Sequence, residues 1–237
     1  MKSIVTQFIY NLTLYLYAPM SEFINHVLQN NNFLLTSGRS IFWEEEKTLI
    51  LSDLHLGKAG HFRKSGIPIP QTIFKEDMQR LVSQLQYFKP LNLLIVGDLF
   101  HSTANKEHDF FLKWRNDFLS IPIQLVKGNH DILKKDWYKN AGISVHDNSY
   151  IVSDFSFTHD INHCGDDESN YCFSGHIHPG IKIRGIGRQA LQLPCFYFRK
   201  KYAVLPAFGM FTGTYPIEPM PGDHIFALAD NSVIKIQ

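Results

Sequence analysis

Cysteine, net charge and long apolar runs are all scarce in this 237-residue chain. The cysteines are odd in number and irregularly spaced, which predicts neither a disulfide framework nor a zinc knuckle and favours a reducing cytoplasm: Cys164, Cys172 and Cys195. The net charge of +1 gives no electrostatic argument for nucleic acid, a membrane surface or an acidic partner. No internal repeat, low-complexity tract or linker interrupts the sequence.

The chain does have enough apolar material for a sizeable core, with 44% hydrophobic and 14% aromatic residues. Residues 1–19 differ from the rest because polar side chains interrupt their apolar run, which argues against a secretory signal. This segment is also too short and polar to span a bilayer, and we expect no membrane partner. Two interpretations stay open: upstream sequence before a native start at Met20, or an ordinary N-terminal extension. Residues 20–237 are expected to form a single domain.

Strands and helices alternate in the first half of the chain, whereas short strands alone fill the second half. In the first half, the apolar spacing predicts strands at 33–35, 40–43, 48–52, 93–96 and 123–126, and helices at 74–88, 110–118 and 132–140. In the second half, it predicts strands at 143–146, 150–153, 155–158, 171–174, 181–183, 191–198, 202–205 and 225–236. A two-sheet α/β sandwich with helices outside explains this order better than one doubly wound sheet.

Metal-binding side chains follow several of these strands. Four aliphatic residues precede Gly97-Asp98, and the ends of three other apolar runs carry comparable donors near a glycine. In open α/β sheets, ligands bind beyond the carboxyl ends of the strands, so we expect these side chains to share one site. They are Asp53, His55, Asp98, Asn129, His159, His176 and His178.

This donor set points to a pair of divalent cations. Two carboxylates, one amide oxygen and four imidazoles suit Mn, Fe or Zn better than Mg or Ca alone. Seven donors are too many for one ion but fit two ions about 3.5–4 Å apart. Asp98 stands centrally among the motifs and is the natural carboxylate bridge between them.

In this order, the motifs resemble those of the calcineurin-like metallophosphoesterase superfamily: Asp53-x-His55, Gly97-Asp98, Gly128-Asn129-His130-Asp131, His159 and Gly175-His176-x-His178. The resemblance implies a four-layer α/β/β/α sandwich, with two mixed sheets flanked by helices. It implies one metal bound by Asp53, His55, Asp98 and His178. The second metal would be bound by Asp98, Asn129, His159 and His176. Relatives often carry a proline soon after the fourth-motif histidine, whereas this chain reads His159-Asp160, which keeps His163 as an alternative ligand.

Further motifs are similar to those of the DNA ligase-associated metallophosphoesterases: residues 54–58, 62–70, 97–102, 193–196 and 205–213. This resemblance implies a manganese-dependent nuclease or phosphodiesterase that acts on DNA in repair, with a functional link to a DNA ligase and a helicase. The expected cofactors are two divalent ions, with manganese preferred and iron or zinc as alternatives.

The resemblance also assigns roles in hydrolysis of the phosphoester by water that the cations activate. His130 would protonate the leaving oxygen without binding metal. Asp131 would hold that loop in place, and this structural role is favoured over direct chemistry. His101 would contact phosphate or assist the acid, but a histidine that bonds backbone at a helix entry is an equal alternative. Lys58 and Arg63 would hold a substrate phosphate.

The substrate class depends mainly on the subfamily resemblance, since no basic patch with interleaved aromatics stands out. One alternative is a phosphomonoesterase or cyclic-nucleotide phosphodiesterase on small substrates. Another is a catalytically idle scaffold that binds other proteins. Four other histidines are interpreted as ordinary surface or core residues: His26, His108, His146 and His224.

Overall fold

The computed structural model describes residues 22–58, 60, 62, 66, 72–101, 106–164, 170–185 and 189–237, without the side chains of residues 106 and 107. The predicted extension 1–19 and Arg63 lie outside this part of the chain. No helix within the described ranges is both long and apolar enough to cross a bilayer.

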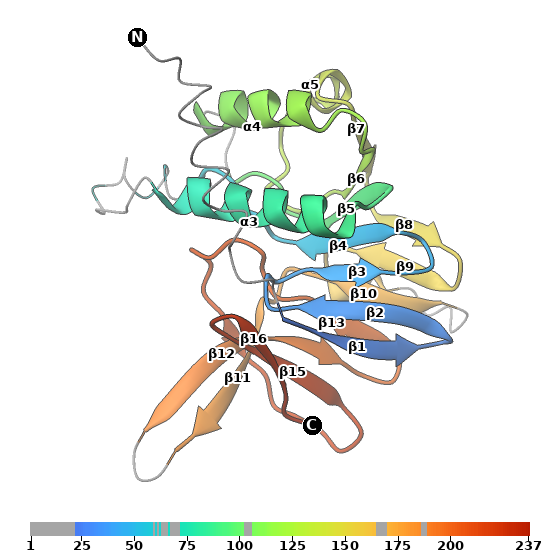
Figure 1. The fold of residues 1–237 in the computed structure, drawn as a ribbon, viewed down its shortest axis with the longest axis vertical. Helices are drawn as coiled ribbons and strands as arrows, with labels where there is room; N and C mark the ends of the chain where they lie inside the picture. The colour runs from blue at the N-terminus through green and yellow to red at the C-terminus, as the bar shows by residue number, and fades with distance from the viewer. Residues whose placement is uncertain are drawn as a thin grey trace.

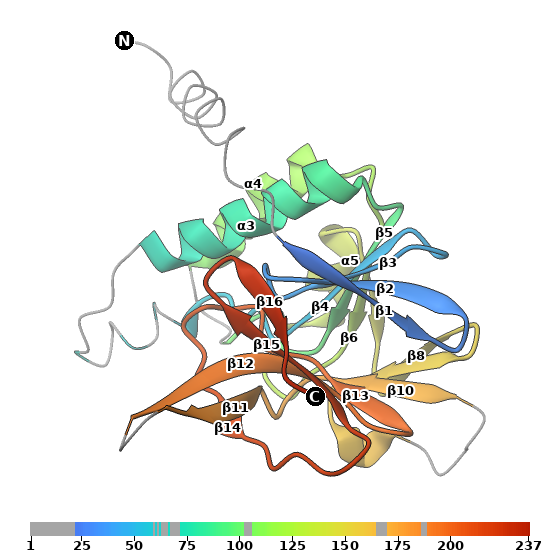
Figure 2. The same cartoon turned by 60° about the horizontal axis from the view of Figure 1, so that its bottom comes forward.

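Two β-sheets pack face to face (Figures 1 and 2). The first sheet runs β1(Phe23–Leu28), β2(Asn31–Thr36), β3(Ile41–Trp43), β4(Thr48–Ser52), β5(Asn92–Val96), β6(Ile123–Val126) and β7(Ile143–His146) in that spatial order. Strands β1 to β4 are antiparallel neighbours, and β4 to β7 are parallel. The parallel half carries the strand ends on which the site is built.

The second sheet is also mixed. Its path is β14(Tyr215–Pro216), β11(Pro179–Arg184), β12(Ala190–Phe198), β13(Tyr202–Val204), β10(Tyr171–Ser174), β9(Phe155–Thr158) and β8(Ser149–Val152). Off this path, β15(His224–Ala229) pairs with β12 and with β16(Ser232–Lys235). Strand β10 runs parallel to both β9 and β13, so neighbouring strand ends meet here as well.

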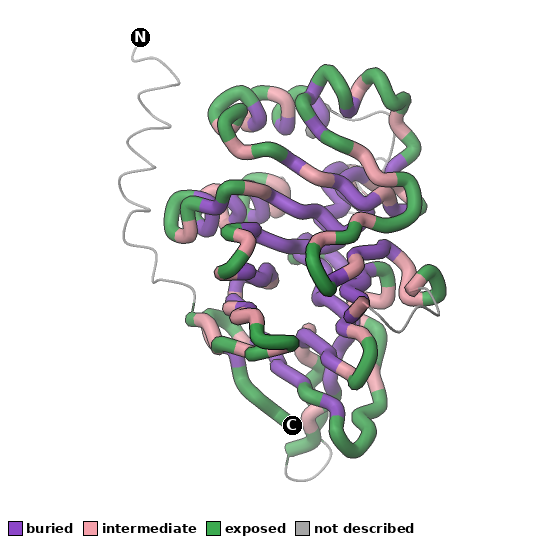
Figure 3. The backbone as a smooth tube through the Cα atoms, turned by 90° about the vertical axis from the view of Figure 1, so that its right-hand side faces the viewer, coloured by how far each residue is buried: buried purple, intermediate pink, exposed green. Residues whose placement is uncertain are grey.

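The described helices are α3(Thr72–Phe88), α4(Lys106–Asp117), α5(Lys135–Asn140) and a 3₁₀ turn, η1(Ile161–His163). The three α-helices cover the outer face of the first sheet, where Leu49, Leu51 and Leu81 share one apolar cluster. Ile50 points the opposite way, into the core between the sheets, because side chains alternate along a strand. Burial on both faces explains the continuous aliphatic run of β4. Figure 3 shows that buried backbone, in purple, gathers in the interior of the molecule.

The core between the sheets is aromatic. Phe33 from the first sheet lies with its ring centroid 5.1 Å from that of Phe155 and 5.3 Å from that of Phe173 in the second sheet. Offset and edge-to-face pairs of this kind add to the gain from burial. The predicted sandwich of two mixed sheets is confirmed. On the outer face of the second sheet, the described residues include only η1 and loops, with Ile161 packed there.

Some element boundaries differ from those predicted. The helix expected at 132–140 begins only at Lys135, because turn hydrogen bonds from Asp131 N to Gly128 O (3.2 Å) and Ile132 N to His130 O (2.9 Å) hold the preceding loop. The single strand expected at 225–236 is the hairpin β15–β16, which turns at Asp230 with φ of 49°. Strand β1 was not predicted.

The cysteine prediction was wrong. Cys164 and Cys172 form a disulfide with an S–S distance of 1.99 Å and a Cα–Cα distance of 5.9 Å, and Cys195 is a buried free thiol. The sequence spacing gave no signal of the pair, because the two cysteines meet only where the end of η1 lies beside β10. The disulfide therefore closes the segment between the predicted ligands His159 and His176.

Candidate metal centre

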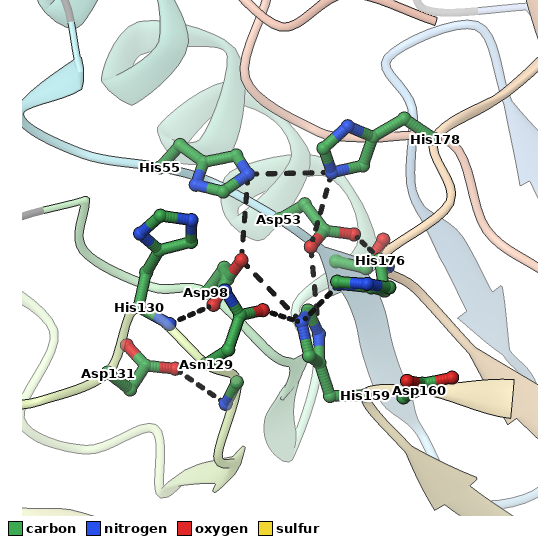
Figure 4. Close-up of polar contacts among 12 residues, drawn as sticks. Asp53, His55, Asp98, Asn129, His130, Asp131, His159, Asp160, His176 and His178 are labelled. Carbon is green, nitrogen blue, oxygen red and sulfur yellow. Dashed lines mark hydrogen bonds and ion pairs between the residues drawn. The ribbon is translucent and has the colours of Figure 1, made fainter. Parts of the chain in front are cut away.

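The predicted ligands come together because the strands that precede them end in register. In the first sheet, Ser52 pairs with Val96 and Val96 with Val126 at the last positions of β4, β5 and β6. In the second sheet, Ser174 pairs with Thr158 at the ends of β10 and β9. The residues that follow these five strand ends converge at one edge of the sandwich (Figure 4).

The backbone at this edge is strained. Five predicted ligands have a left-handed φ, which is uncommon for residues other than glycine: Asp53 (50°), His55 (48°), Asp98 (45°), His176 (66°) and His178 (52°). A conformation of this kind typically costs about 1–3 kcal/mol per residue and collects at functional sites. The strain here coincides with the positions that the sequence marked for metal binding.

Two glycines let these groups approach. A Cβ placed on Gly97, where φ is +81°, would lie 1.8 Å from His159 Nδ1. A Cβ on Gly128 would lie 2.2 Å from Asp98 Oδ1. Both glycines are therefore needed for their close contact with a predicted ligand rather than only for turning the chain.

Within the described residues, the side chains form two candidate metal clusters that share Asp53. In the first cluster, His178 Nε2 lies 3.4 Å from both His55 Nε2 and Asp53 Oδ1. The second cluster joins Asp53, Asp98 and His159, with His159 Nδ1 3.7 Å from Asp53 Oδ1 and His159 Nε2 3.6 Å from Asp98 Oδ2. Asp98 Oδ2 also lies 3.7 Å from His55 Nε2, so this oxygen faces ligands of both clusters.

The remaining two predicted ligands extend the second cluster. His159 Nε2 lies 2.9 Å from Asn129 Oδ1 and 3.0 Å from His176 Nδ1 (Figure 4). Asn129 and His176 are exposed, whereas His159 is buried. The structure thus brings all seven predicted ligands into one constellation that is open to solvent on the side of Asn129 and His176. His163, the alternative ligand, belongs to η1 instead.

Burial sets the charge states of the inner groups. It lowers the pKa of His55 to about 3, which keeps that imidazole neutral and able to donate a lone pair. Burial raises the pKa of Asp98. Burial also opposes ionisation of Asp53, but the neighbouring imidazoles, His178 first, hold its pKa below the usual value. Two buried carboxylates beside the neutral imidazole of His55 form an environment suited to cations.

The donor atoms fit divalent cations in both type and position. No hydrogen bond reaches the buried Asp53 Oδ1 within the described part of the chain, and an unpaired buried carboxylate oxygen is costly. The two Nε2 atoms of His55 and His178 face each other at 3.4 Å, a spacing at which a shared cation would satisfy both lone pairs. Imidazole with carboxylate is a ligand combination that transition-metal ions favour.

The predicted catalytic residues surround this constellation. The His130 backbone N–H donates to Asp98 Oδ1 (2.8 Å), and the His130 ring lies with its centroid 5.4 Å from that of His55. The ring of His101 stacks on that of His130. The buried carboxylate of Asp131 accepts hydrogen bonds from the backbone N–H groups of Gly128 (3.0 Å) and Phe100 (3.2 Å).

Asp131 therefore ties the loop after β6 to the segment after β5. Burial raises the pKa of this carboxyl to about 7. Lys58, one of the two predicted phosphate contacts, is half-buried. Lys58 and His55 line the same cavity. Burial lowers the pKa of the Lys58 ammonium, and the nearby carboxylates of Asp53 and Asp98 oppose this shift.

An aromatic pair beside the centre was missed in the sequence. The rings of Phe62 and Phe211 lie with centroids 5.7 Å apart and planes at 79°. Both rings line a hollow together with Lys58. The two phenylalanines stand far apart in the chain, so sequence spacing gave no signal of their proximity.

Comparison with known proteins identifies this arrangement. A family model described as calcineurin-like phosphoesterase matches residues 46–194. No curated protein matches the chain. The crystal structure of the Pseudomonas putida nuclease MPE is similar to this one with a TM-score of 0.77 and 25% sequence identity, over 91% of this chain and 100% of that chain. Because the family model spans more than half of the sequence and the site carries a divalent-metal constellation, the chain belongs to the calcineurin-like phosphoesterase family and is a metal-dependent hydrolase.

Proposed function

We propose that this enzyme hydrolyses phosphodiester bonds in nucleic acid, with DNA as the substrate. The observation that carries the proposal is the similarity to a nuclease over the whole length of that nuclease, at 25% identity. The open side of the metal constellation, at Asn129 and His176, gives a polymer access to it. Lys58 supplies a cation next to the centre.

In the proposed assignment, Asp53, His55, Asp98 and His178 hold one cation, and Asp98, Asn129, His159 and His176 hold the other. When bound, two divalent cations supply a water of lowered pKa and neutralise charge on the phosphoryl group. The shared contacts of Asp98 Oδ2 support this carboxylate as the bridge. The presence of Asp53 in both clusters makes it the alternative bridge.

His130 has a separate role in the proposal. Its backbone N–H donates to Asp98, while its imidazole lies beside the ring of His55 (Figure 4) and stacks on that of His101. A ring in that position can transfer a proton to the leaving oxygen of the phosphoester. His101 stacks beside it and can share that proton or contact a substrate phosphate. Asp131 acts by holding the loop of His130 and does not contact the substrate.

The experiment that tests the function is cleavage of labelled single-stranded and duplex DNA by the manganese-loaded enzyme, with Asp98→Asn as the control. Cleavage by the wild type and loss in the variant support the proposal. Hydrolysis of p-nitrophenyl phosphate without cleavage of DNA would favour a phosphomonoesterase instead. Retained partner binding and cell phenotype in Asp98→Asn would favour a protein-binding scaffold.

The finer biological setting is also a proposal. The subfamily motifs support a role in DNA repair beside a DNA ligase and a helicase, and they support manganese as the metal. The mixed set of carboxylate, amide and imidazole donors also suits iron and zinc, which are the alternatives. We propose a cytoplasmic location. The Cys164–Cys172 disulfide is unusual for that compartment, so thiol trapping in intact cells tests the location directly.

A further inference from the structure

A solvent-exposed hollow adjoins the metal centre and is not accounted for by the hydrolytic residues. It is lined by Lys58, Phe62, Met210, Phe211, Thr212 and Gly213. Met210 and Phe211 expose 52% and 37% of their surface. A neighbouring cavity shares Lys58 and Phe211 with this hollow and is also lined by His55, a residue of the first metal cluster.

The loop that carries Phe211 is fixed directly to the strand end of the metal centre. Phe208 N donates to Ser52 O (2.7 Å), and Gly209 N donates to Asp53 O (3.2 Å). A Cβ on Gly209 would lie 2.6 Å from Leu54 O, so only glycine permits this close approach. The position of the Phe211 backbone is therefore coupled to that of the predicted ligand Asp53.

Helix α3 holds the same loop from the other side. The buried carboxylate of Asp77 accepts hydrogen bonds from Met210 N (3.1 Å) and from Arg80 Nη2 (2.8 Å). The Arg80 guanidinium lies over the ring of Phe208, 4.3 Å from its centroid. A loop anchored by a buried ion pair and by strand-end backbone presents its exposed aromatic ring in a defined position, which lowers the entropic cost of binding a ligand there.

We propose that Phe62 and Phe211 form a stacking platform for a base of single-stranded nucleic acid, while Lys58 contacts the adjacent phosphate on the path to the metal centre. The proposal rests on the proposed nuclease function and names the form of its substrate. Phe211 exposes 37% of its surface beside Phe62, and an aromatic ring next to a cation is the basic unit of single-strand recognition. A base in a duplex is already stacked on both faces, so the platform favours unpaired strands.

Binding without catalysis tests the platform first. The affinity of metal-free enzyme in EDTA for a fluorescein-labelled single-stranded oligonucleotide is measured by anisotropy for the wild type, Phe62→Ala, Phe211→Ala and Phe211→Trp. We expect each alanine variant to bind roughly 5- to 150-fold more weakly, the range for removing one base–aromatic stack, and Phe211→Trp to bind like the wild type. Tyr87→Ala is the matched control, an exposed ring on α3 that lies about 21 Å along the helix from Ile73 of the neighbouring cavity.

An abasic substrate then locates the stacked base. Each oligonucleotide of a series carries one abasic tetrahydrofuran residue, at a different position in each. The wild type should bind one member of the series more weakly than it binds the unmodified oligonucleotide. Phe211→Ala should bind that member and the unmodified oligonucleotide equally well. Wild-type affinity in both alanine variants, or equal loss at that position in wild type and Phe211→Ala, would overturn the platform. Platform-dependent binding without any cleavage by the manganese-loaded enzyme would instead contradict the proposed nuclease function, so the two failures are distinguishable.

Discussion

The imidazole rings of His101 and His130 are stacked, with centroids 4.6 Å apart and planes inclined by 27°. Both rings also form edge-to-face contacts with the ring of His55. The centroid of His55 lies 5.6 Å from that of His101 and 5.4 Å from that of His130. The stack places two titratable rings beside the metal ligands while the His130 backbone is bound to Asp98. The proposed function therefore assigns proton transfer to His130 and metal binding to other side chains, although the His130 backbone is bonded to the proposed ligand Asp98.

Replacing His130 by alanine should lower turnover and leave the metals in place. General acids typically contribute about 10²–10⁴-fold, so we expect a loss in kcat of that order. The hydrogen bond to Asp98 comes from the backbone and is available in the variant. Steady-state kinetics and elemental analysis of the same sample check both parts. A variant that has lost its metal would show that His130 is a ligand and not the proton donor.

Replacing Gly97 by alanine should empty the metal centre. The new Cβ would lie 1.8 Å from His159 Nδ1, so the imidazole must move out of its cluster. The matched control is Gly222→Ala, which has φ of +91° but no neighbouring atom within 4 Å of the added Cβ. Both variants bear backbone strain, but only Gly97→Ala should lose bound metal in equilibrium dialysis. Equal metal content in the two variants would contradict the role assigned to the close approach.

The His26 ring should make stability depend on pH. Its centroid lies 4.4 Å from the ring of Phe198, and burial, with His224 and Lys235 nearby, lowers its pKa from 6.5 to about 4. The unfolded chain therefore binds a proton at a higher pH than the folded one, and stability falls as pH decreases from about 6.5 toward 4. Urea unfolding across this range should give a shallower pH dependence for His26→Gln than for the wild type. Identical slopes would show that the ring does not titrate as described.

The thiols should react in a fixed order. Cys195 is fully buried, and burial raises its pKa to about 12, so it should resist Ellman's reagent in the native protein. Unfolding without reductant should release this one thiol, and reduction should release all three. Loss of the disulfide in Cys172→Ser should lower the free energy of unfolding by about 2–4 kcal/mol. Three reactive thiols in the unreduced, unfolded protein would show that Cys164 and Cys172 are not joined.

The sequence predicted the parts of this fold that depend on local patterns. Aliphatic runs such as 93–96 are buried strands, and donors that follow parallel strands must meet at one sheet edge, so the convergence around Asp98 could be anticipated. Strand β1 was missed because its polar Asn25 and His26 are adjacent, which breaks the alternation of apolar and polar residues expected of a strand.

Features that depend on distant contacts could not be predicted. The Phe62–Phe211 pair forms only when the loop after β13 docks on the end of β4, and no spacing rule connects these positions. The Cys164–Cys172 disulfide likewise depends on the end of η1 lying beside β10. The left-handed backbone at Asp53 and Asp98 was not predicted either. Aspartate is among the residues enriched in that region, but residue preference does not mark which aspartates adopt it.

The most direct test of the central claim is the number of metal ions held by the enzyme. Protein stripped with EDTA, reloaded with manganese and desalted should contain two ions per chain by elemental analysis, and anomalous diffraction should place both among Asp53, Asp98, His159 and His178. Asp98→Asn should hold less metal under the same conditions. A wild-type protein that retains no metal, or binds it away from these side chains, would contradict the account.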